Sequence, residues 1–210
     1  MLKSDIHIGI MGGTFNPIHY GHLLAAEEAR QKFNLKEIIF VPCARPPHKN
    51  QKDIAGPEDR YKMTCLAIES NKYFKASDIE LKRGGISYSQ DTIIEFKKIY
   101  ERAQIYFITG ADAIAEIDTW KNAKDLPKLC QFIAVTRPCY PLKIKEEYFT
   151  YILEIPGVSI SSTEIRQRIH EGKSIKYLVP EDVENYIYEH NLYQRVVTVH
   201  RKDTETQRKN

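Results

Sequence analysis

Short apolar runs alternate with amphipathic stretches through residue 138, and this alternation constrains the fold more than any other feature of the chain. Five segments in which apolar residues run together or alternate predict strands at 5–11, 37–42, 74–81, 103–110 and 130–138. Three segments with a helical period predict helices at 20–33, 56–70 and 89–100. Strands and helices in this order predict the α/β class, a doubly wound and mostly parallel sheet, with a small helical part at the C-terminal end.

A length of 210 residues suits a single domain of this class. We expect that domain to cover 1–199 and to be followed by a disordered tail at 200–210, which contains no apolar residue. No segment has the apolar length of a signal peptide or membrane helix, which predicts a cytoplasmic protein without a membrane partner. The net charge of +3 is scattered, which gives no reason to expect a nucleic-acid partner. The cysteines lack zinc-ligand spacing, so no protein-bound metal is predicted.

The first predicted strand runs directly into GGTFNPIHYGH at 12–22. In doubly wound sheets ligands bind beyond the carboxyl ends of the strands, so this segment is a candidate site. Its glycine spacing matches neither a P-loop nor a dinucleotide fingerprint. Gly12 and Gly13 would let backbone amides approach a phosphate, and a helix starting directly afterwards would present His19 and His22 to the same anion. The alternative is a pair of surface or capping histidines.

A second helix start is predicted in ISSTEIR at 160–166, where a serine and a glutamate have capping-box spacing. Ser162 and Thr163 would place hydroxyls at its N-terminus, and Arg166 could reach the anion bound by the first motif. The alternative is an ordinary capped helix with a solvated arginine. The hypothesis requires these two helix starts, far apart in the sequence, to lie together in the fold.

These motifs resemble the HxGH nucleotidyltransferase superfamily. Within it, the chain is similar to the nicotinate mononucleotide adenylyltransferase family through GGTFNPIHYGH, RPPHK, SYSQDT, TGAD, TRP, ISSTEIR and LVPEDVENYIYEHNLY, in the order in which that family has them. The resemblance implies a Rossmann-like fold and transfer of the adenylyl group of ATP to nicotinate mononucleotide, which yields deamido-NAD and pyrophosphate. It also implies Mg²⁺, carried mainly by the phosphates of ATP.

The resemblance implies catalytic roles for His19, His22 and Arg166. The residues that it implies for ATP are Gly12, Gly13, Thr14, Gly110, Asp112, Arg137, Ser162 and Thr163. Asp112 would contact ribose hydroxyls, with helix capping as the alternative. Arg137 would lie near the adenine, with a solvated arginine as the alternative.

The residues implied for nicotinate mononucleotide are His48, Lys49, Ser89, Asp91 and Trp120. Trp120 would stack on the pyridine ring, with partial core burial as the alternative. Ser89 and Asp91 would meet the carboxylate, with helix capping by Ser89 as the alternative, and His48 and Lys49 would meet the phosphate unless they are simply solvated. The chain departs from the family at Asn16, where Asp is frequent and would add a negative charge beside the phosphates, and at Ser89, where Thr is common.

Three other functions remain compatible with parts of the sequence. The same chemistry could act on nicotinamide mononucleotide, on phosphopantetheine or in cytidylyl transfer, although His19 and the PPHK segment argue against phosphopantetheine. A non-catalytic nucleotide-binding regulator would tolerate loss of His22 or Arg166, and both are present. An RNA-binding module would need a basic stripe with interleaved aromatic residues, whereas the tyrosines near the C-terminus follow a helical pattern.

Overall fold

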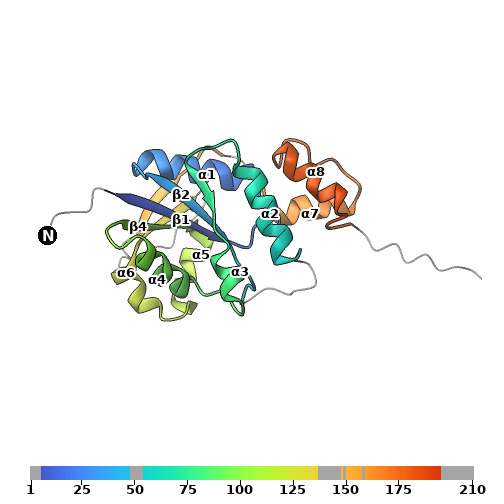
Figure 1. The fold of residues 1–210 in the computed structure, drawn as a ribbon. Coiled ribbons are helices and arrows are strands. Elements are labelled where there is room, and N and C mark those ends of the chain that lie inside the picture. The colour runs from blue at the N-terminus through green and yellow to red at the C-terminus, as the bar shows by residue number, and fades with distance from the viewer. Residues whose placement is uncertain (1–5, 48–53, 137–147, 149, 158, 195–210) are drawn as a thin grey trace, which may run out of the picture.

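The computed structural model describes residues 6–47, 54–136, 148, 150–157 and 159–194. They form one sheet with helices on both faces, and a pair of C-terminal helices lies at one end of it (Figure 1). In chain order the elements are β1 (His7–Gly13), α1 (Tyr20–Lys32), β2 (Glu37–Pro42), α2 (Pro57–Ile68), β3 (Phe74–Ala76), α3 (Ile79–Arg83), α4 (Ser89–Ile99), β4 (Gln104–Gly110), α5 (Ala111–Ala115), the 3₁₀ turns η2 (Ile117–Thr119) and η3 (Ala123–Asp125), α6 (Leu126–Leu129), β5 (Gln131–Thr136), β6 (Thr150–Glu154), α7 (Ser162–His170) and α8 (Glu181–Glu189).

The sheet has six strands in the order β3-β2-β1-β4-β5-β6, and every neighbouring pair is parallel. The chain winds outward from β1 to β3 and then returns to place β4 on the other side of β1. The winding therefore reverses between β1 and β4, and their diverging carboxyl ends leave a crevice. This arrangement confirms the predicted doubly wound, Rossmann-like fold.

Alternation along the strands divides the core into two layers. Met11, Phe40 and Ile108 pack against buried residues of α1, α2, α7 and α8 on one face. Ile10 and Phe107 pack against buried residues of α4, α5 and α6 on the other face. Because both faces are covered, the central strands carry continuous apolar runs, as in the fully buried β2.

Two parts of the sheet differ from the prediction. The strand expected at 74–81 ends at Ala76, and residues 79–83 form α3. The buried side chain of that short helix is Glu80, which accepts a hydrogen bond from the Thr92 hydroxyl. A strand with alternating apolar residues would have exposed this glutamate, so the alternation was misleading. The edge strand β6 was not predicted, because its exposed apolar residues Tyr151 and Ile152 give it no regular pattern.

The C-terminal helices continue the layer formed by α1 and α2. In Figure 1, α7 and α8 lie beyond α2 at the end of the molecule, and the Tyr186 hydroxyl on α8 donates a 3.0 Å hydrogen bond to Asp59 on α2. No helix in the described part of the chain is long and apolar enough to span a membrane. The tail expected at 200–210 lies outside the described residues.

Candidate active site

Two pockets open on either side of the end of β1. They share Gly12, Gly13, Thr14 and, from the end of β4, Thr109. The histidine pocket, about 440 Å³, lies on the α1 side and is lined in addition by His19, His22 and Asp112. The tryptophan pocket, about 730 Å³, lies on the α4 side and is lined in addition by Ser89, Trp120 and Lys121. The ends of β1 and β4 and the first residue of the turn after β1 therefore border both pockets.

The peptide groups of this turn are oriented by donors on the side away from the crevice. The Gly13 carbonyl accepts a 2.9 Å hydrogen bond from the Cys43 N–H, and the Thr14 carbonyl accepts one of 2.8 Å from Arg60 Nη1. In a trans peptide the N–H points opposite to the C=O. The N–H groups of Thr14 and Phe15 consequently point away from these donors, toward the crevice, in the orientation that favours an anion.

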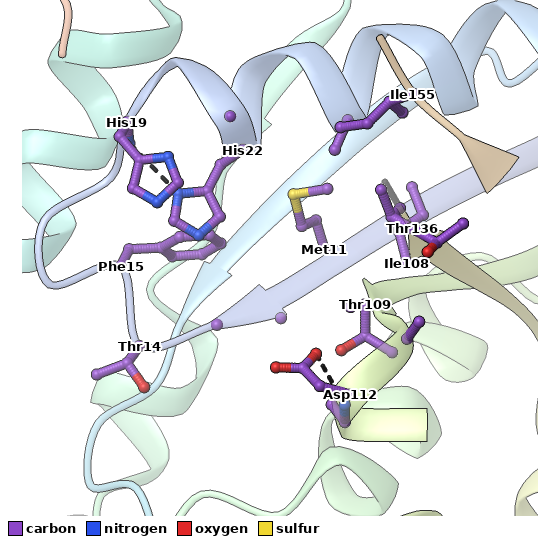
Figure 2. Close-up of a pocket in the computed structure, with 18 of the residues that line it drawn as sticks. Met11, Thr14, Phe15, His19, His22, Ile108, Thr109, Asp112, Thr136 and Ile155 are labelled. Atoms are coloured by element: carbon purple, nitrogen blue, oxygen red, sulfur yellow. Dashed lines mark hydrogen bonds between the residues drawn. The ribbon is translucent and has the colours of Figure 1, made fainter. Parts of the chain in front are cut away.

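His19 and His22 stand at the start of α1, as predicted. His19 is the N-cap in an extended conformation and is buried, and its ring stacks on that of His22 with 3.8 Å between the centroids (Figure 2). The His19 backbone N–H donates a 3.3 Å hydrogen bond to His22 Nδ1. A neutral imidazole that accepts at Nδ1 carries its proton on Nε2, so a ligand in the pocket would meet the Nε2–H of His22 as a donor.

Gly21 leaves room for the His19 ring at this helix start. A Cβ at this position would lie 3.0 Å from His19 Nδ1 and 3.8 Å from the backbone carbonyl oxygen of Ile160. The first contact would displace the His19 ring. The second shows that the residues just before α7 lie against the first turn of α1.

The start of α7 docks on the turn between β1 and α1. The side chain of its N-cap Ser161 accepts a 3.1 Å hydrogen bond from the Glu164 N–H, which confirms the serine half of the predicted capping box, whereas Glu164 Oε1 accepts from Arg168. The Ser162 hydroxyl donates to the Pro17 carbonyl at 2.9 Å, and Arg166 Nη1 donates to the Asn16 carbonyl at 2.9 Å. The two helix starts thus lie together.

The hydroxyls of α7 and its arginine are nevertheless engaged within the protein. Arg166 Nη2 donates to the Thr163 hydroxyl at 3.3 Å, and the residues that line the histidine pocket do not include Ser162, Thr163 or Arg166. In this structure the three side chains hold the turn and each other. They lie beside the pocket that they were predicted to line.

The opposite wall of the histidine pocket is formed by the ends of β4 and β5. Asp112 lines it, across the end of β1 from the two histidines (Figure 2), and its Oδ1 accepts a 2.9 Å hydrogen bond from the Ala113 N–H. The N-cap of α5 is Gly110 and Asp112 is the second residue of the helix, so the alternative that Asp112 is its N-cap is wrong. Val135 and Ile155 add apolar surface to the same pocket. Arg137 lies outside the described residues.

Trp120 forms a wall of the tryptophan pocket and also packs on the core. Its ring meets Phe107 and Phe132 edge-on, with centroid separations of 6.1 and 6.2 Å, which confirms partial core burial, while stacking on a pyridine ring stays a prediction. Ser89 lines the pocket as the first residue of α4, and the N-cap is Tyr88. The proposed capping by Ser89 is therefore wrong.

The Asp91 carboxylate faces Lys121 at the tryptophan pocket. Both of its oxygens accept from Lys121 Nζ at 3.0 Å, and the residues that line the pocket include Lys121 but not Asp91. The aspartate therefore positions a cation beside the pocket. His48 and Lys49, the other predicted contacts of the second substrate, lie outside the described residues.

Glu80 was not predicted and lies in the wall of the tryptophan pocket. It is 5% exposed, and burial raises the pKa of its carboxyl above the ordinary value. The Thr92 hydroxyl donates to it, and Arg83 Nη2 lies 3.8 Å from its Oε1. The pocket thus contains a carboxyl whose charge is disfavoured by its surroundings.

Asn16, where the related family frequently has Asp, lies behind the turn. Its Oδ1 accepts hydrogen bonds from the Ala55 N–H at 3.0 Å and from the Tyr193 hydroxyl at 2.8 Å. The side chain is buried and lines neither pocket. The side chain therefore holds the turn from behind, and its effect on the charge near the phosphates stays a prediction.

Sequence reasoning also missed Arg60 on α2. Its side chain is 1% exposed and holds the turn after β1 through the Thr14 carbonyl. The helical period of α2 contains the signal that could have found it, because the residues buried along its inner face are Arg60, Met63, Thr64, Ala67 and Ile68. A charged residue in line with such a stripe is buried with it.

The described residues contain no group of three or more His, Cys, Asp or Glu side chains that could hold a metal ion. Cys43, Cys65 and Cys130 are free thiols.

Comparisons with known proteins agree on one family. A family model described as cytidylyltransferase-like matches residues 10–168. A probable nicotinate-nucleotide adenylyltransferase of Thermoanaerobacter sp. (strain X514) is 48% identical over 205 residues, which cover 92% of this chain and 97% of that protein. Another, of Thermus thermophilus, is 46% identical and covers 90% of this chain and all of that protein. The solved structure of Plasmodium falciparum nicotinic acid mononucleotide adenylyltransferase complexed with NaAD has a TM-score of 0.74 at 25% identity, and covers 90% of this chain and 97% of that one.

Proposed function

We propose that this chain, which belongs to the cytidylyltransferase-like family and within it to the nicotinate-nucleotide adenylyltransferases, transfers the adenylyl group of ATP to nicotinate mononucleotide. The products are deamido-NAD and pyrophosphate, and the reaction is a step of NAD biosynthesis. The observation that carries this proposal is the pair of pockets that meet at Gly12, Gly13 and Thr14, in a chain that aligns with these enzymes over nine tenths of its length.

In this reaction a phosphate oxygen of the mononucleotide attacks the α-phosphorus of ATP. A new P–O bond forms there, the bond between the α-phosphorus and the bridging oxygen breaks, and pyrophosphate leaves with the electron pair. Because the nucleophile is already an anion, no general base is required. The protein has to align the two phosphates and stabilise the charge that builds up on the oxygens around the α-phosphorus.

The histidine pocket suits ATP. The backbone N–H groups of Thr14 and Phe15 and the Nε2–H of His22 face an anion at the end of β1, and the N-terminus of α1 adds its positive dipole. Val135 and Ile155 offer apolar contact to the purine, and Asp112 offers an acceptor to ribose hydroxyls. In our proposal His19 and His22 bind the triphosphate and stabilise the transition state.

Ser162, Thr163 and Arg166 are proposed to hold the β- and γ-phosphates. To do so they must exchange some of their present bonds to the Asn16 and Pro17 carbonyls for bonds to phosphate oxygens. Such an exchange couples binding of the triphosphate to the seating of α7 on the turn.

The tryptophan pocket suits nicotinate mononucleotide. Trp120 presents a ring for stacking, and Ser89 and Lys121 offer a hydroxyl and a cation to the carboxylate. Because Gly12, Gly13 and Thr14 also line this pocket, a phosphate bound beside them lies next to the phosphates of ATP. His48 and Lys49 are proposed to meet that phosphate.

Mg²⁺ is proposed as the accompanying cation. It binds phosphate oxygens and water in preference to an all-protein cage, and it neutralises charge on the triphosphate. It therefore enters the site as part of the nucleotide substrate.

The proposal is tested by incubating the protein with ATP, Mg²⁺ and one acceptor at a time, and measuring pyrophosphate release. We expect the highest kcat/KM with nicotinate mononucleotide, a lower value with nicotinamide mononucleotide and no release with phosphopantetheine. Activity on phosphopantetheine alone would overturn the substrate assignment. Absence of activity on all three would favour the regulator.

A further inference from the structure

Arg60 is the charged side chain most completely removed from solvent in the described part of the chain, at 1% exposure. Its guanidinium donates three hydrogen bonds to backbone carbonyls: to Thr14 at 2.8 Å, to Ala44 at 3.1 Å and to Ala55 at 3.0 Å. It also donates to Cys43 Sγ at 3.7 Å. One side chain thus fastens the turn after β1, the segment that leaves β2 and the segment that enters α2.

The charge of Arg60 is bound by neutral groups. Among the described residues, every hydrogen-bond acceptor of Arg60 is a carbonyl or a thiol, and no carboxylate forms an ion pair with it. The neighbouring carboxylate on α2, Asp59, instead accepts from the Tyr186 hydroxyl. Burying a cation without an anion is unfavourable, and hydrogen bonds to carbonyl dipoles offset only part of the desolvation cost.

The location of this charge relates it to the substrates. Thr14, which Arg60 contacts, lines both pockets, and each of the two substrates carries phosphates. A second cation, Arg166, donates to the Asn16 carbonyl two residues further along the turn. Two guanidinium groups thus donate to carbonyls of the same short turn, Arg60 to Thr14 and Arg166 to Asn16.

The hydrogen bond to Thr14 also acts on the donor that faces the crevice. The Thr14 carbonyl and the Phe15 N–H belong to one peptide group, and a cationic donor on the oxygen polarises that group. The N–H consequently becomes a stronger donor toward an anion. No direct contact between the arginine and a ligand is needed for this effect.

We propose that Arg60 is a positioning residue that orients the Thr14–Phe15 peptide toward bound phosphate. From behind the turn it also supplies a positive charge that the phosphates of the substrates compensate. The inference rests on the proposed function, since phosphates are the anions at this turn. It predicts that Arg60 discriminates between phosphorylated and unphosphorylated forms of the same nucleoside.

The test compares the dissociation constants of ATP and adenosine for the wild-type protein and for Arg60→Gln, measured by titration calorimetry. We expect ATP affinity to fall on the order of tenfold or more, because the charge behind the turn and the charge-assisted hydrogen bond to the Thr14 carbonyl are both lost, while adenosine affinity changes less than about twofold. If Arg60 had a purely structural role, the variant would lose affinity for both ligands to the same extent or for neither. An unchanged ratio of the two dissociation constants would overturn the proposal.

Arg60→Lys separates charge from orientation and provides a second variant if Arg60→Gln does not fold. Lysine keeps the positive charge but cannot reach three carbonyls with a rigid fork. We expect its KM for ATP to stay within about threefold of wild type while kcat falls about tenfold, because charge is retained and orientation is lost. A kcat equal to wild type in this variant would contradict the positioning role.

The matched control is Ile68→Ala, which removes a buried side chain from the same helix without touching the Arg60 contacts. It should lower the melting temperature while leaving the ratio of ATP to adenosine affinity as in wild type. Failure of the proposed function is separately visible, because it would appear as a wild-type protein that binds ATP but does not use nicotinate mononucleotide.

Discussion

The two pockets at the end of β1 are built from different materials. The histidine pocket is formed by strand ends, the backbone of a tight turn and a helix N-terminus, with its two imidazoles locked by stacking. The tryptophan pocket is formed largely by side chains from connecting segments, among them Pro46, Tyr88 and Lys121. Backbone groups on rigid elements bind phosphates, which all nucleotides share. Side chains on connecting segments can change without disturbing the sheet, so we expect the choice of acceptor to reside there.

The largest expected effect lies in the histidine pocket. His22→Ala removes the Nε2–H donor and the ring on which His19 stacks, so turnover should fall by about 10² or more, the usual effect of losing a transition-state donor. Pyrophosphate release under saturating substrates measures it. The control is His190→Ala, an exposed histidine on the end of α8 that stacks on Tyr186. An equal loss of turnover in the two variants would contradict a specific role for His22 in the histidine pocket.

An intermediate effect is expected in the tryptophan pocket, and on a different kinetic constant. Trp120→Ala should raise KM for nicotinate mononucleotide about tenfold to a hundredfold, because stacking on an aromatic ring contributes about 1–3 kcal/mol, while KM for ATP stays unchanged. Trp120→Phe retains a ring against Phe107 and should recover most of the loss. A parallel rise in both KM values would show that the two pockets are not independent.

A smaller effect is expected from the ion pair beside Trp120. Lys121→Met should raise KM for the nicotinate substrate about threefold at low salt and less at high salt, because partly exposed charges are screened. Initial rates across a salt series measure this. The effect of His22→Ala should persist at high salt. A Lys121 effect that does not depend on salt would point to a buried contact instead.

The smallest expected effect concerns Glu80 and stability. Burial raises the pKa of its carboxyl, so the folded protein keeps this proton at pH values where the unfolded chain has released it. The free energy of unfolding should therefore fall as the pH rises from about 4.5, the ordinary value, through the raised pKa, and Glu80→Gln should flatten this slope. Urea unfolding at several pH values measures both curves. Identical slopes would mean that Glu80 titrates normally.

The sequence was most informative where function depends on local backbone. The motif around His19 and His22 predicted a strand end, a turn and a helix start in one short segment, because each of these has a local chemical signature. The cap at Ser161 was predicted for the same reason. That both starts lie together followed from requiring a common anion.

Features that depend on long-range packing were predicted less well. The role of Arg60 was not predicted because its three carbonyl partners lie 5, 16 and 46 residues away in the sequence. No local sequence pattern indicates these contacts. The bonds of Arg166 and Ser162 to the turn, in place of pocket-facing positions, have the same origin. Glu80 was misread because tertiary contacts with Thr92 turned a glutamate inward.

The wall common to the two pockets, Gly12 to Thr14, has a thermodynamic consequence for turnover. In the proposed function the reaction joins the adenylyl half and the nicotinate half into one molecule, which would then occupy both pockets as a tethered pair. Tethering raises the effective concentration of each half at its own pocket, so the dinucleotide would bind more tightly than the affinity of either substrate alone indicates. Fast product release, and with it fast turnover, would therefore require each pocket to bind its own half of the product only moderately.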